Sequence, residues 1–155
     1  DWLNGRRTPF ADQTLKGAIT GLTLGTTAPK IFRALVEATA FGAKAIVERF
    51  REEGVAINQV IAIGGIAKKS DFVMQITTDV LNMPIKVADS EQACALGAGL
   101  FGAVASGLYA DVAEAQAKMG SSFSKTYHPN PENAIQYEKL YQRYIELGEQ
   151  LQVKG

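Results

Sequence analysis

The stretch VIAIGGIAKKSDFVMQ, residues 60–75, decides the fold of this chain, because two glycines join a strand pattern to a helix pattern there. Residues 60–63 form an apolar run rich in β-branched side chains, which suits a strand covered on both faces in a parallel sheet. Gly64 and Gly65 end that run. Because they lack a Cβ, they can adopt positive φ and let a flat ligand approach the main chain.

Ser70 marks the start of the helix that we expect after the glycines. Its hydroxyl can accept a hydrogen bond from a backbone N–H that has no partner in the first helical turn. An ordinary strand-to-helix turn has the same composition, so the glycine motif alone leaves a binding turn and a structural turn both open. The neighbouring motifs have to decide between the two.

Length and charge exclude several classes of protein. At 155 residues the chain has the length of one domain and can bury a core. Lys plus Arg and Asp plus Glu both number 16, so no net charge draws the chain to nucleic acid or to a membrane surface. The lone Cys94 cannot form an internal disulfide, and the single His128 leaves no zinc cluster. With no apolar run near the roughly 20 residues of a membrane span, we expect a cytoplasmic protein.

The remaining pattern alternates strands with helices. We expect strands over 15–24, 60–63 and 85–87, and helices over 28–53, 70–82, 90–107, 111–119 and 130–153. Thr27 is expected to cap the first long helix, with Pro29 inside its first turn. The helix over 90–107 is rich in alanine and glycine, so we expect it to be buried against a sheet. This alternation predicts an α/β fold with a mainly parallel sheet flanked by helices.

An aromatic stripe runs along the last predicted helix. Tyr137, Tyr141 and Tyr144 recur at helical spacing. Such a stripe either packs against the core or forms a surface for a partner, and packing is the favoured interpretation.

Four separated motifs cover most of the chain. They are GRRTP at 5–9 with Asp12, the run from Gly17 through GLT at 21–23 to ALVE at 34–37, GGIA at 64–67 with Ser70, and SEQ at 90–92 with ALGA at 95–98. Together these motifs resemble the FGGY carbohydrate kinases. Two positions depart from that family's pattern: Lys30, where the family usually has an acidic, amide or histidine side chain, and Ile66, where it often has glycine.

The resemblance implies a fold and a division of the chain. The fold is the C-terminal half-domain of the actin-like ATPase (ribonuclease H-like) architecture. Residues 1–155 would form part of the nucleotide-binding C-terminal domain, with 120–155 as a peripheral helical extension. The first hairpin of this half-domain would lie between the strands at 15–24 and 60–63, and we expect this chain to lack it. Unpaired strand edges invite association, so a homo-oligomer is expected.

The same resemblance implies ATP and Mg²⁺ as cofactors and a sugar as the substrate. The expected nucleotide-binding residues are Gly64, Gly65, Ile66, Ala67, Ser70, Gly5 and Arg7. The glycines and Ala67 would form the wall under the base, with Ser70 near its polar edge. Arg7 would pair with a phosphate or carboxylate, or alternatively form a structural pair with Asp12. Lys68 and Lys69 would either contact phosphate or remain solvated, and solvation is favoured.

No catalytic base or metal ligand is expected within the chain. The family takes its catalytic aspartate from sequence upstream, and Asp71, Asp79 and Asp89 lie at positions where acids commonly meet helix N-termini or solvent. Mg²⁺ and the sugar would therefore be held mainly by the missing N-terminal part, and this chain alone would be inactive. Two alternatives remain: an ATP-regulated binding module of the actin and chaperone type, and a non-catalytic assembly domain.

Overall fold

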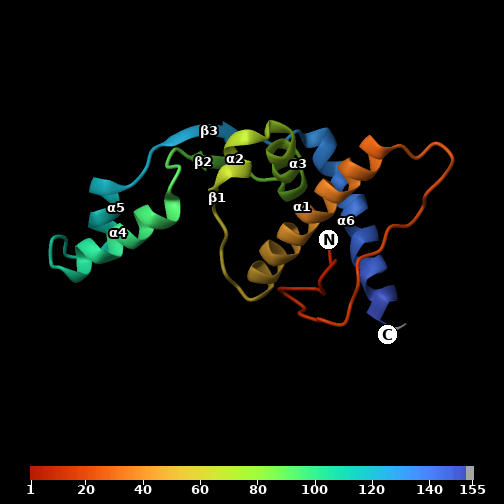
Figure 1. Cartoon of the computed structure of the whole chain (residues 1–155), viewed down its shortest axis with the longest axis horizontal. Coiled ribbons are helices and arrows are strands. Elements are labelled where there is room, and N and C mark those ends of the chain that lie inside the picture. The colour runs from red at the N-terminus through yellow and green to blue at the C-terminus, as the bar shows by residue number, and fades with distance from the viewer. Residues whose placement is uncertain (153–155) are drawn as a thin grey trace.

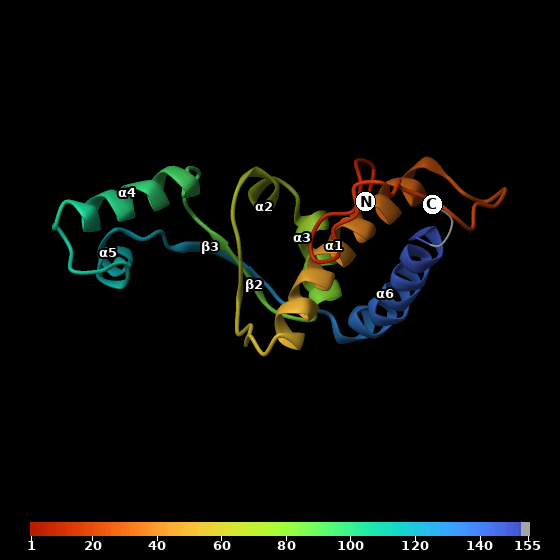
Figure 2. The same cartoon turned by 90° about the horizontal axis from the view of Figure 1, so that it is seen from below.

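The computed structural model describes residues 1–152. Its elements, in chain order, are α1 (Ala28–Glu52), β1 (Val60–Ala62), α2 (Gly65–Lys69), α3 (Asp71–Leu81), β2 (Ile85–Ala88), α4 (Ala93–Ala105), α5 (Val112–Met119), β3 (Phe123–Tyr127) and α6 (Pro131–Gln152). Helices α1, α3 and α6 lie together in a body that also carries the N-terminal loop (Figures 1 and 2). Helices α4 and α5 form an arm that projects from the other end of the sheet.

The sheet has the order β1-β2-β3. Strands β1 and β2 are parallel, with Val60 opposite Ile85, and β2 and β3 are antiparallel, with Ile85 opposite Tyr127. The predicted α/β class is confirmed, and the sheet contains one parallel and one antiparallel pairing. Strand β3 was not predicted, because four of its five residues are exposed and its FSKTY sequence lacks an apolar run.

The strand predicted over 15–24 is wrong. These residues have no regular secondary structure, and Ile19, Leu22 and Leu24 are exposed. Strand propensity reports how well side chains fit a pleated, half-buried surface. A segment with this propensity forms a strand only where a neighbouring strand supplies hydrogen-bond partners. Within residues 1–152 no strand lies beside this segment.

The burial predicted for the helix at 90–107 is also wrong. Helix α4 forms, but none of its residues is buried, and its main packing partner is α5. The apolar composition of a helix indicates that another element should pack on it, but it does not ensure that such an element is present. The helix therefore leaves an exposed apolar surface that includes Phe101, which is 63% exposed.

We expect the isolated chain to self-associate through this uncovered surface, because large exposed apolar patches on soluble proteins mark interaction or aggregation sites. Light scattering should give an apparent mass that rises with protein concentration. The variant Phe101→Glu should weaken this rise, whereas Gln116→Glu on α5 should leave it unchanged. A mass that stays monomeric at every concentration would contradict the expectation.

Local signals explain the helix boundaries. Thr27 occupies the N-cap position of α1 with extended backbone and Pro29 lies in the first turn, but the threonine side chain makes no capping hydrogen bond. The capping predicted for Ser70 is confirmed, because its hydroxyl accepts from the N–H of Val73 at 3.3 Å. The short helix α2 was not predicted, since five residues are too few to show a helical period.

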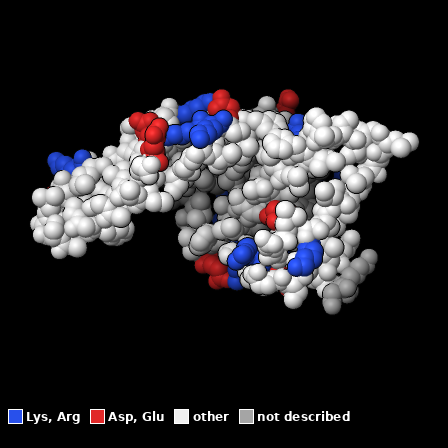
Figure 3. All heavy atoms as spheres, viewed as in Figure 1, with Lys and Arg blue, Asp and Glu red and all other residues white. Residues whose placement is uncertain are grey.

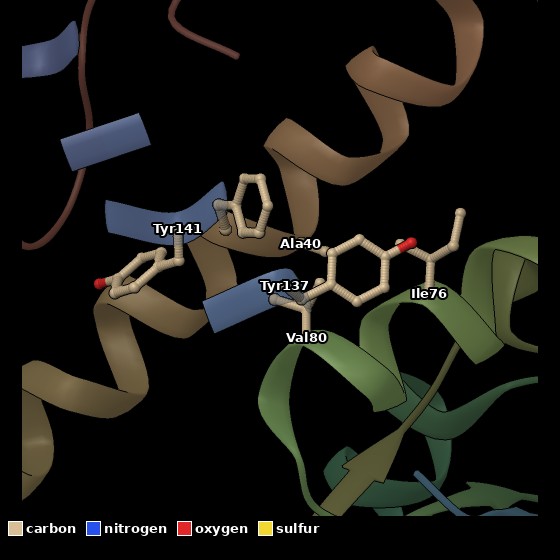
Figure 4. Packing of buried hydrophobic residues seen from close by; sticks show 6 residues of the cluster. Ala40, Ile76, Val80, Tyr137 and Tyr141 are labelled. Atoms are coloured by element: carbon tan, nitrogen blue, oxygen red, sulfur yellow. The ribbon is translucent and has the colours of Figure 1, made fainter. Parts of the chain in front are cut away.

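Two clusters of buried side chains form the core. One joins three helices and contains Ala40 and Phe41 of α1, Ile76 and Val80 of α3, and Tyr137 and Tyr141 of α6. Figure 4 shows the Tyr137 ring lying beside Ala40, Ile76 and Val80. The other contains Ala67, Met74, Leu81, Ile85, Val87 and Tyr127 around the sheet. The tyrosine stripe of α6 therefore packs, as the favoured interpretation predicted.

Candidate functional site

The glycine turn, residues 64–66, follows β1 and leaves its main chain open. Gly64 has φ +85° and ψ −179° and precedes α2, and a side chain would be strained in that conformation. A Cβ at Gly64 or Gly65 would meet no atom within 4 Å apart from those of its chain neighbours and, for Gly65, of the nearby helix backbone. The side chain of Ile66 is 58% exposed, and none of its atoms lies within 4 Å of the position that a Cβ of Gly64 would occupy. The turn is therefore not filled by the protein's own side chains.

A second loop, residues 89–92, lies at the same edge of the sheet. Because β1 and β2 are parallel, the glycine turn and this loop both follow carboxyl ends of neighbouring strands. In open α/β sheets, ligands bind in the crevice outside such ends. The Nζ of Lys68 donates to the carbonyl oxygen of Asp89 at 2.6 Å, so a side chain of α2 connects the two segments.

Further hydrogen bonds hold the 89–92 loop from its other side. The N–H of Asp89 donates to the carbonyl oxygen of Ser122 at 2.8 Å, and the N–H of Ser90 donates to the hydroxyl of Ser121 at 2.8 Å. The loop is therefore connected to the segment between α5 and β3 as well as to α2.

Charged side chains gather near this edge. Figure 3 shows lysine or arginine and acidic side chains side by side over the top of the body, where Figure 1 places α2 and β3. The Tyr127 hydroxyl donates to Asp71 Oδ1 at 2.6 Å, and Lys125 Nζ lies 2.9 Å from the same oxygen. The hydrogen bond from Tyr127, followed by that from Lys125, lowers the pKa of Asp71. A carboxylate so engaged is poorly suited to accept a substrate proton.

The predicted residues of the glycine motif do not all face outward. Gly64, Gly65 and Ile66 are exposed together, but Ala67 is 3% exposed and packs in the core cluster around the sheet. The hydroxyl of Ser70 is engaged as the cap of α3. A ligand at this turn would thus meet mainly the backbone of residues 64–66.

The fold of the N-terminal loop itself requires a glycine at position 5. It is buried with φ +83°, and a Cβ there would meet the Cα of Gln13 at 2.6 Å. The loop closes on itself at this point, where Arg6 and Asp12 exchange two backbone hydrogen bonds of 2.8 and 2.9 Å. This close approach requires glycine whether or not a ligand is bound.

Arg7 does not form the alternative pair with Asp12. The Asp12 carboxylate accepts from the N–H and the hydroxyl of Thr14, at 2.9 and 2.6 Å. Arg7 is exposed, and within residues 1–152 its guanidinium forms no ion pair or hydrogen bond. It remains available to an anion.

Gly5 and Arg7 line a cleft of about 600 Å³ between the N-terminal loop, α1 and α6. Its apolar walls include Trp2, Phe10 and Ile46. None of residues 64–70 lines it. The structure therefore divides the predicted nucleotide-binding residues between the glycine turn and a separate cleft, a division that sequence spacing does not reveal.

Residues 1–152 show neither a metal cluster nor a membrane-spanning helix. Among residues 1–152, no group of three or more His, Cys, Asp or Glu side chains is placed to hold a metal ion. No helix in this described range is long and apolar enough to cross a membrane.

A comparison with known protein families shows to which family this chain belongs. A model of the C-terminal domain of the FGGY family of carbohydrate kinases matches residues 1–106. This chain belongs to the FGGY family. The FGGY resemblance inferred from the four motifs is thereby confirmed.

Relatives of this FGGY chain include two ribulokinases. That of Vibrio parahaemolyticus is 53% identical over 98% of this chain, and that of Bacillus licheniformis is 49% identical over 95%. The chain spans 27% of the length of each of these relatives. Among solved structures, a ligand-bound xylulose kinase from Lactobacillus acidophilus superposes with a TM-score of 0.84 at 30% identity, covering 97% of this chain and 30% of that one. The predicted actin-like architecture is confirmed by this likeness.

Proposed function

We propose that this chain is the ATP-binding C-terminal part of a sugar kinase that converts L-ribulose to L-ribulose 5-phosphate in arabinose catabolism. Membership of the FGGY family and the ribulokinase names of its relatives support the reaction. Four stretches also resemble the sequence of L-ribulokinase, namely DWLNGRRTPF, GGIAKKS, DVLNMPIKV and SEQACALGA. The observation that carries the nucleotide role is the open main chain at Gly64 and Gly65.

In this proposal the adenosine of ATP rests on the backbone of residues 64–66, between the glycine turn and the 89–92 loop. ATP supplies the phosphoryl group, and the chain's own residues bind and orient the nucleoside. Ala67 and Ser70 support the turn without contacting the nucleotide. Ala67 packs in the core cluster around the sheet, and Ser70 caps α3. Arg7 is proposed to pair with an anionic group on its own side of the molecule, with Gly5 shaping its loop.

The chemical step needs groups that we assign to the longer protein. Phosphoryl transfer requires Mg²⁺ on the phosphates and a carboxylate that accepts the proton of the sugar hydroxyl. Residues 1–152 offer no cluster for the metal, and Asp71 is engaged by Tyr127 and Lys125. We therefore place the metal ligands, the base and the sugar contacts outside this chain. A cytoplasmic location is proposed for the enzyme, in keeping with its single free cysteine.

The variant Gly65→Ala tests the nucleotide role. Gly65 lies in helix α2 without positive φ, so alanine fits the chain and favours the helix. A methyl group on the face that receives the nucleoside should nevertheless lower the affinity for ATP by about tenfold, or about 1.4 kcal/mol. Calorimetric titration of the full-length protein with ATP measures the affinity, and thermal melting should show no loss of stability.

Gly102→Ala is the matched control. Gly102 also lies in a helix, α4, and a Cβ there would likewise meet no atom within 4 Å outside its chain neighbours and the nearby helix backbone. Its affinity for ATP should equal that of the unchanged protein. Equal affinities in both variants would contradict a nucleotide seat at Gly65. ATP binding without ADP release on addition of L-ribulose would favour the actin and chaperone type of module.

A further inference from the structure

We propose that Lys68 is a positioning residue, which holds the glycine turn and the 89–92 loop at a fixed separation so that a nucleoside fits between them. The inference rests on the proposed nucleotide site and adds a residue to it. From its sequence, Lys68 is expected only to contact phosphate or to remain solvated. The structure assigns its ammonium group to the carbonyl oxygen of Asp89, at 2.6 Å.

The bond joins segments that are far apart in sequence. Lys68 lies in α2, which begins at Gly65, whereas Asp89 follows the last residue of β2. Among residues 1–152, this is the one hydrogen bond between α2 and the 89–92 loop. Other hydrogen bonds of that loop lead to Ser121 and Ser122, which lie between α5 and β3, and to Leu96 of α4.

The surroundings of the loop make this bond important for its placement. Helix α4 starts at Ala93, directly after the loop, and it packs against α5 but has no buried residue. The arm therefore cannot fix the loop by burial against the body. The Lys68 side chain supplies a direct connection from the glycine turn to that loop.

Pre-organisation links this connection to affinity. A ligand that needs both segments in place binds with an apparent dissociation constant equal to the intrinsic one divided by the fraction of molecules in the competent arrangement. Removing the bond lowers that fraction without removing any contact to the ligand. The affinities for adenosine, ADP and ATP should therefore fall by the same factor.

The test uses the full-length protein with Lys68→Met, which keeps the length of the side chain and removes its donor. We expect dissociation constants for adenosine, ADP and ATP to rise together by about tenfold, the loss of one charge-assisted hydrogen bond. The KM for the sugar should not change. Lys68→Arg should retain most of the affinity, because a guanidinium can also donate to the Asp89 carbonyl oxygen.

Lys69→Met is the control, since Lys69 lies on the same helix and its side chain makes no hydrogen bond within the described residues. Its affinities should match those of the unchanged protein. A loss in Lys68→Met confined to ADP and ATP would overturn the inference, because it would indicate direct phosphate contact. Equal rises in the KM of both substrates with a lower melting temperature would overturn it as a general structural defect. Normal affinity in Lys68→Met together with weak binding in Gly65→Ala would refute the role of Lys68 and leave the proposed function standing.

Discussion

Replacing Phe41 with alanine is expected to lower the free energy of unfolding by about 3–5 kcal/mol, the usual range for deleting a buried phenyl ring. Phe41 is 6% exposed on α1. Its ring centroid lies 6.2, 6.0 and 5.6 Å from those of Tyr137, Tyr141 and Tyr144 on α6. The substitution would leave a cavity between the two helices and remove three aromatic contacts, so α6 should loosen from the body.

Phe50→Ala provides the control, because Phe50 lies on the same helix and is 48% exposed. Its loss should cost less than about 1 kcal/mol. Urea unfolding followed by circular dichroism at 222 nm, a wavelength dominated by helix, measures both variants. Equal midpoints for the two variants would show that the ring of Phe41 does not carry the packing between α1 and α6.

Replacing Asp79 with alanine is expected to lower the free energy of unfolding by about 3 kcal/mol, because buried donors lose a charged acceptor. Asp79 is 2% exposed on α3. Its carboxylate accepts from Gln75 Nε2, from the N–H of Asn130 and from Asn133 Nδ2, each at 2.8 Å. Two of these donors lie at the start of α6, so the carboxylate anchors the beginning of that helix on α3.

Asp111→Asn is the comparison for Asp79. Asp111 caps α5 by accepting from the N–H of Glu114 at 2.8 Å, and asparagine caps a helix about as well as aspartate. Its unfolding free energy should change by less than about 0.5 kcal/mol. Hydrogen exchange should show faster exchange in the first turns of α6 for Asp79→Ala only. Unchanged exchange there would mean that packing of the tyrosines, and not Asp79, holds the helix.

Some features of the candidate site have local causes in the sequence, and others depend on residues that are far apart in the chain. The bend at Gly64 and the cap at Ser70 could be predicted, because each depends on a conformation or a hydrogen bond within a few residues. The connection from Lys68 to Asp89 could not, because the two residues are 21 positions apart and meet only once β1 and β2 pair. The placement of Arg7 in a different cleft from the glycine turn has the same origin.

The sequence by itself determined the helices α1, α3, α4, α5 and α6, the strand patterns at 60–63 and 85–87, the α/β class and the FGGY resemblance. These depend on periodicity, end signals and motifs, all of which are written in neighbouring residues. Only the tertiary structure decided that residues 15–24 are not a strand, that α4 is uncovered, and that FSKTY is a strand. Pairing and burial need a second surface, and the identity of that surface is not encoded in the segment that meets it.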